Sequence, residues 1–136
     1  MERLTQRLAL ARRALSSLGE LAKLSTPSLI ERDAAIQRFE YTVEACWKAA
    51  RAVLADHFGL ELASPKPVVR ACAQNGLLAE ADARAAMDMI DDRNLSSHTY
   101  NEELAIAIFS RLAAHEAILT RWLTALESVQ APSTGK

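Results

Sequence analysis

The sequence predicts an all-α fold, an antiparallel up-and-down bundle of about five helices. Three observations favour it: half of the 136 residues are hydrophobic, only four glycines and four prolines interrupt the chain, and apolar residues recur at helical spacing. No stretch alternates between apolar and polar residues as a half-buried strand does. The length indicates one domain, which we assign to residues 1–130, followed by a disordered tail at residues 131–136.

The first helix is expected near the N-terminus, where leucines and alanines from Leu4 to Leu21 follow one another at steps of three and four. The sequence STPS at residues 25–28 interrupts this pattern. Hydroxyl side chains are preferred at the residue that caps a helix N-terminus. We therefore expect Ser25 or Thr26 to cap the second helix.

The second helix is expected to run from about Pro27 to Phe58, with its apolar stripe facing the core. Gly59 follows it and is a typical residue at a helix C-terminus. A helix of about 30 residues is about 45 Å long, because each residue adds about 1.5 Å. That length exceeds what a compact monomer of this size needs, so part of the helix is expected to contribute to a dimer.

Three further helices are expected in the second half of the chain. A short one opens at the sequence SPKP, residues 64–67, and the next begins between residues 78 and 80. The last helix follows the polar sequence RNLSSHTY, residues 93–100. Thr99 and Glu102 have the spacing of a capping box, in which each side chain binds the backbone N–H of the other residue, so the last helix is expected to begin there.

Composition and charge narrow the classes of function. The formal net charge of −1 gives no general attraction to nucleic acid or anionic lipid. No apolar run approaches the roughly 20 residues of a membrane span, and the N-terminus lacks a signal-peptide pattern, so we expect a cytoplasmic protein without membrane contact. Cys46 and Cys72 lie in helical patterns without metal-ligand spacing, so we expect buried thiols and predict no metal site and no cofactor.

Polar side chains crowd the end of the fourth helix. Its apolar stripe leads toward Asn94 and then Ser97 or His98, so the buried face is expected to turn polar there. Arg93 and His98 lie about 140° apart around a straight helix, so they converge only if the helix ends between them or if a second chain supplies one of the pair. Such a cluster either satisfies the helix terminus or faces a cleft, and the residues alone leave both open.

Two sequence blocks resemble a known family. The pattern R-x4-H-x-Y, present as Arg93, His98 and Tyr100, is similar to the signature of the HEPN domain (higher eukaryotes and prokaryotes nucleotide-binding). The block RFEYTVEACWKAAR at residues 38–51 and the block MIDDRNLSSHTYNEE at residues 89–103 look like the small helical partner of minimal nucleotidyltransferases. The two blocks occur in order and at a family-like separation, and the resemblance covers most of the chain.

The resemblance implies a helical bundle that forms a homodimer and pairs, as toxin, with a cognate minimal nucleotidyltransferase as antitoxin. It implies metal-independent cleavage of RNA in which Arg93 and His98 are catalytic, and it marks Tyr100 as a target for transfer of AMP from the partner. An alternative is a non-catalytic subunit that binds a nucleotide or another substrate for the nucleotidyltransferase. A third possibility is a structural dimer whose polar cluster only caps helices.

Three further residues are candidates for substrate binding. Asn94 is expected to orient the phosphate or the histidine. Arg38 is long enough to reach a phosphate, although a solvated arginine is the commoner interpretation. Lys48 lies in the first block, where its spacing from Glu44 also fits an ordinary ion pair within one helix. His115 lies on the apolar stripe of the last helix, where a hydrogen-bonded core histidine is expected.

Overall fold

This computed structural model describes residues 2–130 of the chain. That part contains five α-helices and one short 3-10 helix, joined by loops. Their bounds are α1 Glu2–Gly19, α2 Leu29–Phe58, α3 Pro65–Gln74, α4 Glu80–Leu95, η1 Ser96–His98 and α5 Glu102–Gln130. The tail predicted at residues 131–136 lies outside the described residues. The all-α fold with about five helices is confirmed.

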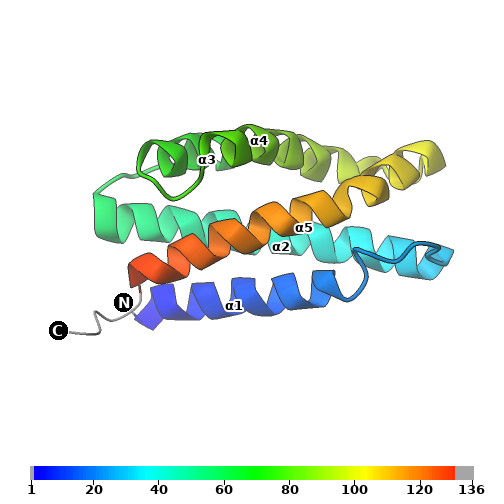
Figure 1. The fold of residues 1–136 in the computed structure, drawn as a ribbon, viewed down its shortest axis with the longest axis horizontal. Coiled ribbons are helices and arrows are strands. Elements are labelled where there is room, and N and C mark those ends of the chain that lie inside the picture. The colour runs from blue at the N-terminus through cyan, green and yellow to red at the C-terminus, as the bar shows by residue number, and fades with distance from the viewer. Residues whose placement is uncertain (1, 131–136) are drawn as a thin grey trace.

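The long helices run up and down the bundle in alternating directions (Figure 1). α2 packs against α1, α3 and α5, while α3 and α4 lie together on the side of the bundle opposite α1. The connection between α1 and α2 lies at the same end of the bundle as the corner between α4 and α5. The polar sequence at that corner therefore meets the N-terminal part of α2.

The N-terminus of α2 is capped by Ser28, so the prediction of Ser25 or Thr26 is wrong. The Ser28 hydroxyl accepts a hydrogen bond from the Glu31 N–H at 3.0 Å, and the Glu31 carboxylate accepts one from the Ser28 N–H at 2.8 Å. This reciprocal pair is a capping box. Pro27 precedes the cap instead of occupying the first turn, because the glutamate that completes the box stands three residues after Ser28.

Two glycines end helices in the left-handed conformation. Gly59 follows α2 with a φ of 67°, and its N–H donates to the Leu54 carbonyl, which confirms the predicted stop. Gly76 follows α3 with a φ of 78°. A side chain at either position would strain the backbone, because L-residues with a β-carbon rarely adopt such φ values.

The N-terminus of α5 begins two residues later than the predicted capping box places it. The Asn101 side chain accepts a hydrogen bond from the Leu104 N–H at 3.1 Å. The Thr99 hydroxyl instead donates to the Ser96 carbonyl at 3.1 Å, so Thr99 and Glu102 do not form the predicted box. The 3-10 helix at Ser96–His98 is followed by a turn, which delays the start of α5 to Glu102.

The core lies between α1, α2 and α5 and extends under α3 and α4. Its largest fully buried side chains include Phe39 on α2 and Trp122 on α5. Cys46 and Cys72 are buried free thiols, as predicted, and the Trp122 indole N–H points to the Cys72 sulfur at 3.4 Å. None of the helices between residues 2 and 130 has the length and apolarity that crossing a membrane requires.

Candidate functional site

The polar sequence wraps the corner where α4 ends and α5 begins. Arg93 lies in the last turn of α4, His98 ends the 3-10 helix, and Tyr100 lies in the turn before α5. The helix therefore ends between Arg93 and His98, which is one of the two ways in which the sequence allows them to converge. His98 is exposed, and Tyr100 is 86% exposed.

His98 and Tyr100 are brought together. The tyrosine hydroxyl lies 3.5 Å from His98 Nδ1, and the two rings meet edge-on with centroids 5.9 Å apart. Both side chains remain open to solvent because they project from the corner. At 3.5 Å the hydroxyl and the ring nitrogen are at the outer limit of a hydrogen bond, and the corner offers an accessible phenol for modification.

Arg93 turns toward α2 instead of toward His98. Its Nε lies 3.6 Å from a Glu44 carboxylate oxygen, which is an ion pair but is too long for a hydrogen bond. This Nε is buried and has no hydrogen-bond partner among the described residues. Within the described part of one chain, no hydrogen bond or ion pair joins Arg93 to His98. The single chain therefore presents the two residues on one corner without a direct contact.

Ser96 anchors the corner, and sequence reasoning missed it. Its side chain is buried, with the hydroxyl within hydrogen-bond distance of the Glu40 carboxylate and 2.6 Å from the Arg93 carbonyl oxygen. One hydroxyl proton serves one of these acceptors at a time. Helical spacing could have indicated that Ser96 is buried, because it lies seven residues after the buried Met89 and so on the same face of the helix.

The buried face of α4 passes through Asp92 and Ser96, so the predicted path through Asn94 and Ser97 or His98 is wrong. Those three residues are exposed. Packing of α4 against α2 and α5 decides which face of the helix is buried. The buried residues lie about one position earlier in the sequence than the predicted stripe, so Asp92 points into the core. The polar groups that enter the core are consequently a carboxylate and a hydroxyl.

Asp92 joins α4 to α5 through a buried cluster behind the corner. Its carboxylate accepts hydrogen bonds from Arg111 Nε at 2.8 Å and Nη2 at 2.7 Å, and it contacts His115 Nε2 at 2.7 Å. The His115 ring stacks on Phe39 with centroids 5.3 Å apart. His115 is thus the hydrogen-bonded core histidine that the sequence predicts. Burial by itself raises the pKa of Asp92. The hydrogen bonds from Arg111 and His115 and the charges of these residues lower it by a larger amount, so the net shift of the pKa is downward.

A depression of about 400 Å³ lies between α2 and the corner. Its lining comes from α2, the 3-10 helix and the following turn: Asp33, Ile36, Gln37, Glu40, Ser96, Thr99 and Tyr100. Two carboxylates thus face Tyr100, while Arg93 and His98 do not line the depression. Carboxylates repel a phosphate, so this depression disfavours an anionic ligand.

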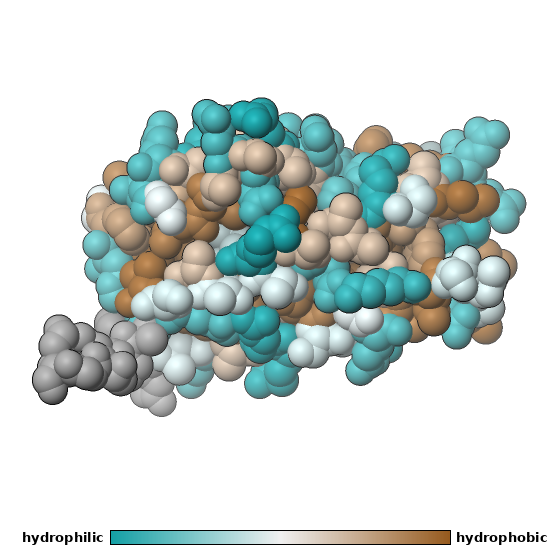
Figure 2. Space-filling model, viewed as in Figure 1, coloured by the Kyte–Doolittle hydropathy of each residue, from teal (hydrophilic) through white to brown (hydrophobic). Residues whose placement is uncertain are grey.

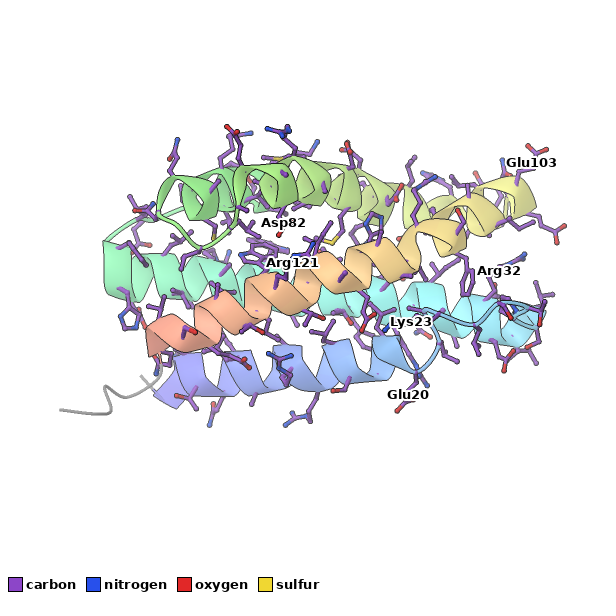
Figure 3. The ribbon with its side chains drawn as sticks, in the orientation of Figure 1. Glu20, Lys23, Arg32, Asp82, Glu103 and Arg121 are labelled. Atoms are coloured by element: carbon purple, nitrogen blue, oxygen red, sulfur yellow. The ribbon has the colours of Figure 1, made fainter. Side chains whose placement is uncertain are left out.

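The other predicted substrate-binding residues lie in different surroundings. Arg38 donates to the Ser17 carbonyl at 2.7 Å and to the Glu20 carboxylate at 2.9 Å, so it points to the end of α1 where Figure 3 labels Glu20. Lys48 pairs with Glu44 at 3.9 Å, and Glu44 thereby links it to Arg93. The exposed Asn94 side chain makes no hydrogen bond within the described residues. Among residues 2–130 no cluster of His, Cys, Asp and Glu has the geometry of a metal site.

Comparisons with known proteins identify the family. Residues 6–128 match the family described as nucleotidyltransferase substrate binding protein like. A Thermus thermophilus protein of known crystal structure is 54% identical, with a TM-score of 0.84 over 85% of this chain and 98% of that chain. No curated protein is significantly similar to the chain.

Two more distant structures share the fold. A substrate binding domain of a nucleotidyltransferase from Haemophilus influenzae is 24% identical, with a TM-score of 0.73 over 88% of this chain and 98% of that chain. The tri-AMPylated HEPN toxin of Shewanella oneidensis, in complex with MNT antitoxin, is 15% identical, with a TM-score of 0.71 over 92% and 96% of the two chains. These two likenesses show the fold alone. Because the family match spans most of its length, the chain belongs to the nucleotidyltransferase substrate binding protein like family.

Proposed function

We propose that the chain is the toxin of a nucleotidyltransferase–HEPN toxin–antitoxin pair and cleaves RNA without a metal ion as a homodimer. The observation that carries this proposal is the complete arginine, histidine and tyrosine pattern at the exposed corner between α4 and α5, where His98 and Tyr100 are in contact. Family membership and the fold shared with a HEPN toxin in complex with its antitoxin support the pairing with a nucleotidyltransferase.

The proposed reaction needs only an acid, a base and a positive charge, because RNA carries its own nucleophile. One His98 takes the proton of the ribose 2′-hydroxyl, and the 2′ oxygen forms a bond to the adjacent phosphorus. The bond from phosphorus to the 5′ oxygen breaks, and that oxygen receives a proton from His98 of the second chain. Arg93 binds the phosphate oxygens as charge builds on them. The products are a 2′,3′-cyclic phosphate and a 5′-hydroxyl.

Arg93 has to exchange partners for this role. Its ion pair with Glu44 is 3.6 Å long and includes no hydrogen bond from Nε, so a phosphate that accepts hydrogen bonds from the guanidinium can replace the carboxylate. A two-fold related corner supplies the second His98 and brings the arginine of one chain beside the histidine of the other. We place this corner and part of α2 in the dimer interface.

Cleavage of RNA by the purified chain in the presence of EDTA tests the proposal. The expected rate falls by about 10²–10⁴-fold in His98→Ala, the usual contribution of a positioned acid–base group. It falls by about 10²–10³-fold in Arg93→Ala, by analogy with the loss of one transition-state donor. His57→Ala is the matched control, because His57 is an exposed histidine that contacts Gln130 at the end of α5 remote from the corner. Cleavage that needs Mg²⁺, or that survives both substitutions at the corner, contradicts the mechanism.

The dimer is tested separately by light scattering at micromolar concentration. We expect twice the chain mass of 14.9 kDa. A stable interface of this kind buries more than about 1,000 Å². A particle of single-chain mass contradicts the shared site, whatever the result of the RNA assay.

The second candidate is a non-catalytic subunit that binds a nucleotide or another substrate for the partner nucleotidyltransferase. The family description and the fold shared with a substrate binding domain favour it. Binding of the partner enzyme with no cleavage of RNA is the result that selects this candidate.

A further inference from the structure

A groove lies between the α1–α2 connection and the N-terminal half of α5. Its volume is about 570 Å³, within the range of about 300–1,000 Å³ that is typical of small-molecule sites. It shares no lining residue with the depression at Tyr100. Figure 3 labels two cations, Lys23 and Arg32, along this half of the bundle beside α5.

Arg32 is the cation with unmet hydrogen-bonding capacity. Its side chain is only 13% exposed, and that side chain makes no hydrogen bond within the described residues. The nearest carboxylate oxygen, on Glu102, lies 3.8 Å from Nη1, and the Glu102 side chain is 73% exposed. A buried guanidinium without a hydrogen-bonded anion is unfavourable, because burial removes water without replacing it. Nε lies too deep for solvent, so an incoming oxygen meets the terminal nitrogens first.

Lys23 adds a second, more mobile positive charge. Its side chain is 70% exposed, and its ammonium group lies 3.4 Å from the Glu116 carboxylate on α5. Lys23 is therefore already paired, and Arg32 is the cation that an anionic ligand would satisfy. At long range Glu116 offsets the charge of Lys23, so Arg32 is the group that attracts a ligand oxyanion.

The walls of the groove are mainly apolar. The apolar lining consists of Ala22, Leu24, Pro27, Ile106, Phe109 and Ala113. Ile106 is 53% exposed, so a ligand that covers it removes apolar surface from water. Figure 2 shows hydrophobic side chains among hydrophilic ones at the surface of this end of the bundle.

We propose that this groove binds a small organic anion whose oxyanion pairs with Arg32 and whose apolar body covers Ile106 and Phe109. A carboxylate or a phosphate group fits the arginine, because both accept paired hydrogen bonds from a guanidinium. The site is separate from the proposed ribonuclease corner and does not depend on it. A small organic anion of this kind is neither a substrate nor a product of the proposed RNA reaction.

The probe for this site is anilinonaphthalene sulfonate, which joins an oxyanion to an aromatic body. Amide NMR spectra recorded during a titration are expected to show saturable binding at one site, with shifts concentrated in residues 22–32 and 106–113. Octanoate tests a carboxylate as the oxyanion, and phenyl phosphate tests a phosphate. Displacement of the probe by either compound supports the proposal. Octanol has the same body as octanoate without the charge, so we expect it to compete at least about 10-fold more weakly than octanoate. Equal competition by octanol and octanoate, or shifts located elsewhere, overturns the proposal.

Variants test the two parts of the ligand separately. Arg32→Gln is expected to weaken probe binding by about 10–100-fold, the usual effect of losing a hydrogen bond to a charged group. Arg84→Gln is the matched control, since Arg84 is 70% exposed and pairs with Glu80 on α4. Ala113→Leu keeps every charge but fills the apolar part, so it should also weaken binding. Unchanged affinity in Arg32→Gln overturns the proposal; if that variant fails to fold, the comparison of octanol with octanoate on the unchanged chain decides.

Discussion

His115 Nε2 lies 2.7 Å from the Asp92 carboxylate, and this buried contact ties the last turns of α4 to the middle of α5. Arg111 closes the cluster from the solvent side with two hydrogen bonds to the same carboxylate. Arg93 follows Asp92 directly in the chain, so the cluster fixes the part of α4 from which the candidate catalytic arginine projects. The corner is thus held from inside the core.

Replacing Asp92 by Asn is expected to lower the free energy of unfolding by about 1–3 kcal/mol. The amide keeps the shape but loses the charge that Arg111 and His115 stabilise, and buried partners of a lost acceptor remain unsatisfied. Urea denaturation measures the difference. Asp91→Asn is the matched control, because Asp91 is an exposed neighbour that pairs only with Lys66 among the described residues. Equal unfolding midpoints for the two variants would contradict a stabilising role for the cluster.

The stabilisation by Asp92 should depend on pH in one direction. The folded state lowers the pKa of this carboxyl, so its contribution is complete above the ordinary carboxyl pKa of about 4 and disappears as the pH falls through the lowered value. The difference in unfolding free energy between the wild type and Asp92→Asn should shrink as the pH falls from about 5 to about 2. Urea denaturation across this range measures it. A difference that grows on acidification has the wrong sign for a lowered pKa.

The thiols should be inert in the folded state. Burial raises the pKa of Cys46 to about 12, and burial raises that of Cys72 to about 11 although the Trp122 indole N–H partly opposes the shift. Only a thiolate attacks a disulfide reagent, so Ellman's reagent at about pH 8 is expected to find almost no reactive thiol. Addition of urea should then release both. Rapid reaction of either thiol before unfolding argues against the buried positions.

The sequence predicts the helices, and the buried faces of α2 and α5, well because helical spacing and glycine stops are local signals. Gly59 marks a helix end whatever packs around it, and the position of His115 on the apolar stripe is enough to place it in the core. The caps are harder to predict, because several hydroxyl residues between positions 25 and 28 are compatible with a helix start. Only the carboxylate of Glu31 decides among them.

The candidate site is predicted only in part. The residues at the corner follow from the sequence pattern, but their exposure does not, because the sequence places Asn94 and Ser97 or His98 on the buried face. The inward direction of Asp92 depends on how α4 packs on α2 and α5, which no local pattern specifies. Likewise, the partner of Arg93 is Glu44, forty-nine positions earlier in the chain, and only the tertiary fold brings the two together.

The cap of α2 provides a direct test of how the helix begins. Ser28→Ala removes the hydroxyl that accepts from the Glu31 N–H, so the free energy of unfolding should fall by about 1 kcal/mol. Ser25→Ala removes a hydroxyl of the same kind three residues earlier, outside the capping box, and should leave stability within about 0.5 kcal/mol of the wild type. Thermal or urea denaturation compares the two. A larger loss in Ser25→Ala would return the helix start to the position that the sequence predicted.

Tyr100 is expected to accept AMP from the partner nucleotidyltransferase. Its side chain is 86% exposed at the corner, so an enzyme can reach the hydroxyl, which lies 3.5 Å from His98 Nδ1. The phenol oxygen would form a bond to the α-phosphorus of ATP as pyrophosphate leaves. The added phosphodiester then carries negative charge and bulk beside His98, which should repel and occlude an RNA phosphate.

Mass spectrometry after incubation with the partner enzyme and ATP measures this modification, and the chain provides its own control. Tyrosine occurs twice, and Tyr41 lies on α2 with its hydroxyl 3.1 Å from the Ser17 hydroxyl. Tyr100→Phe should abolish the addition of AMP, while Tyr41→Phe should leave it unchanged. The modified wild type should also lose RNA cleavage to about the extent of His98→Ala, because both changes disable the same imidazole. Addition of AMP to Tyr100→Phe at the wild-type level means that another residue is the acceptor.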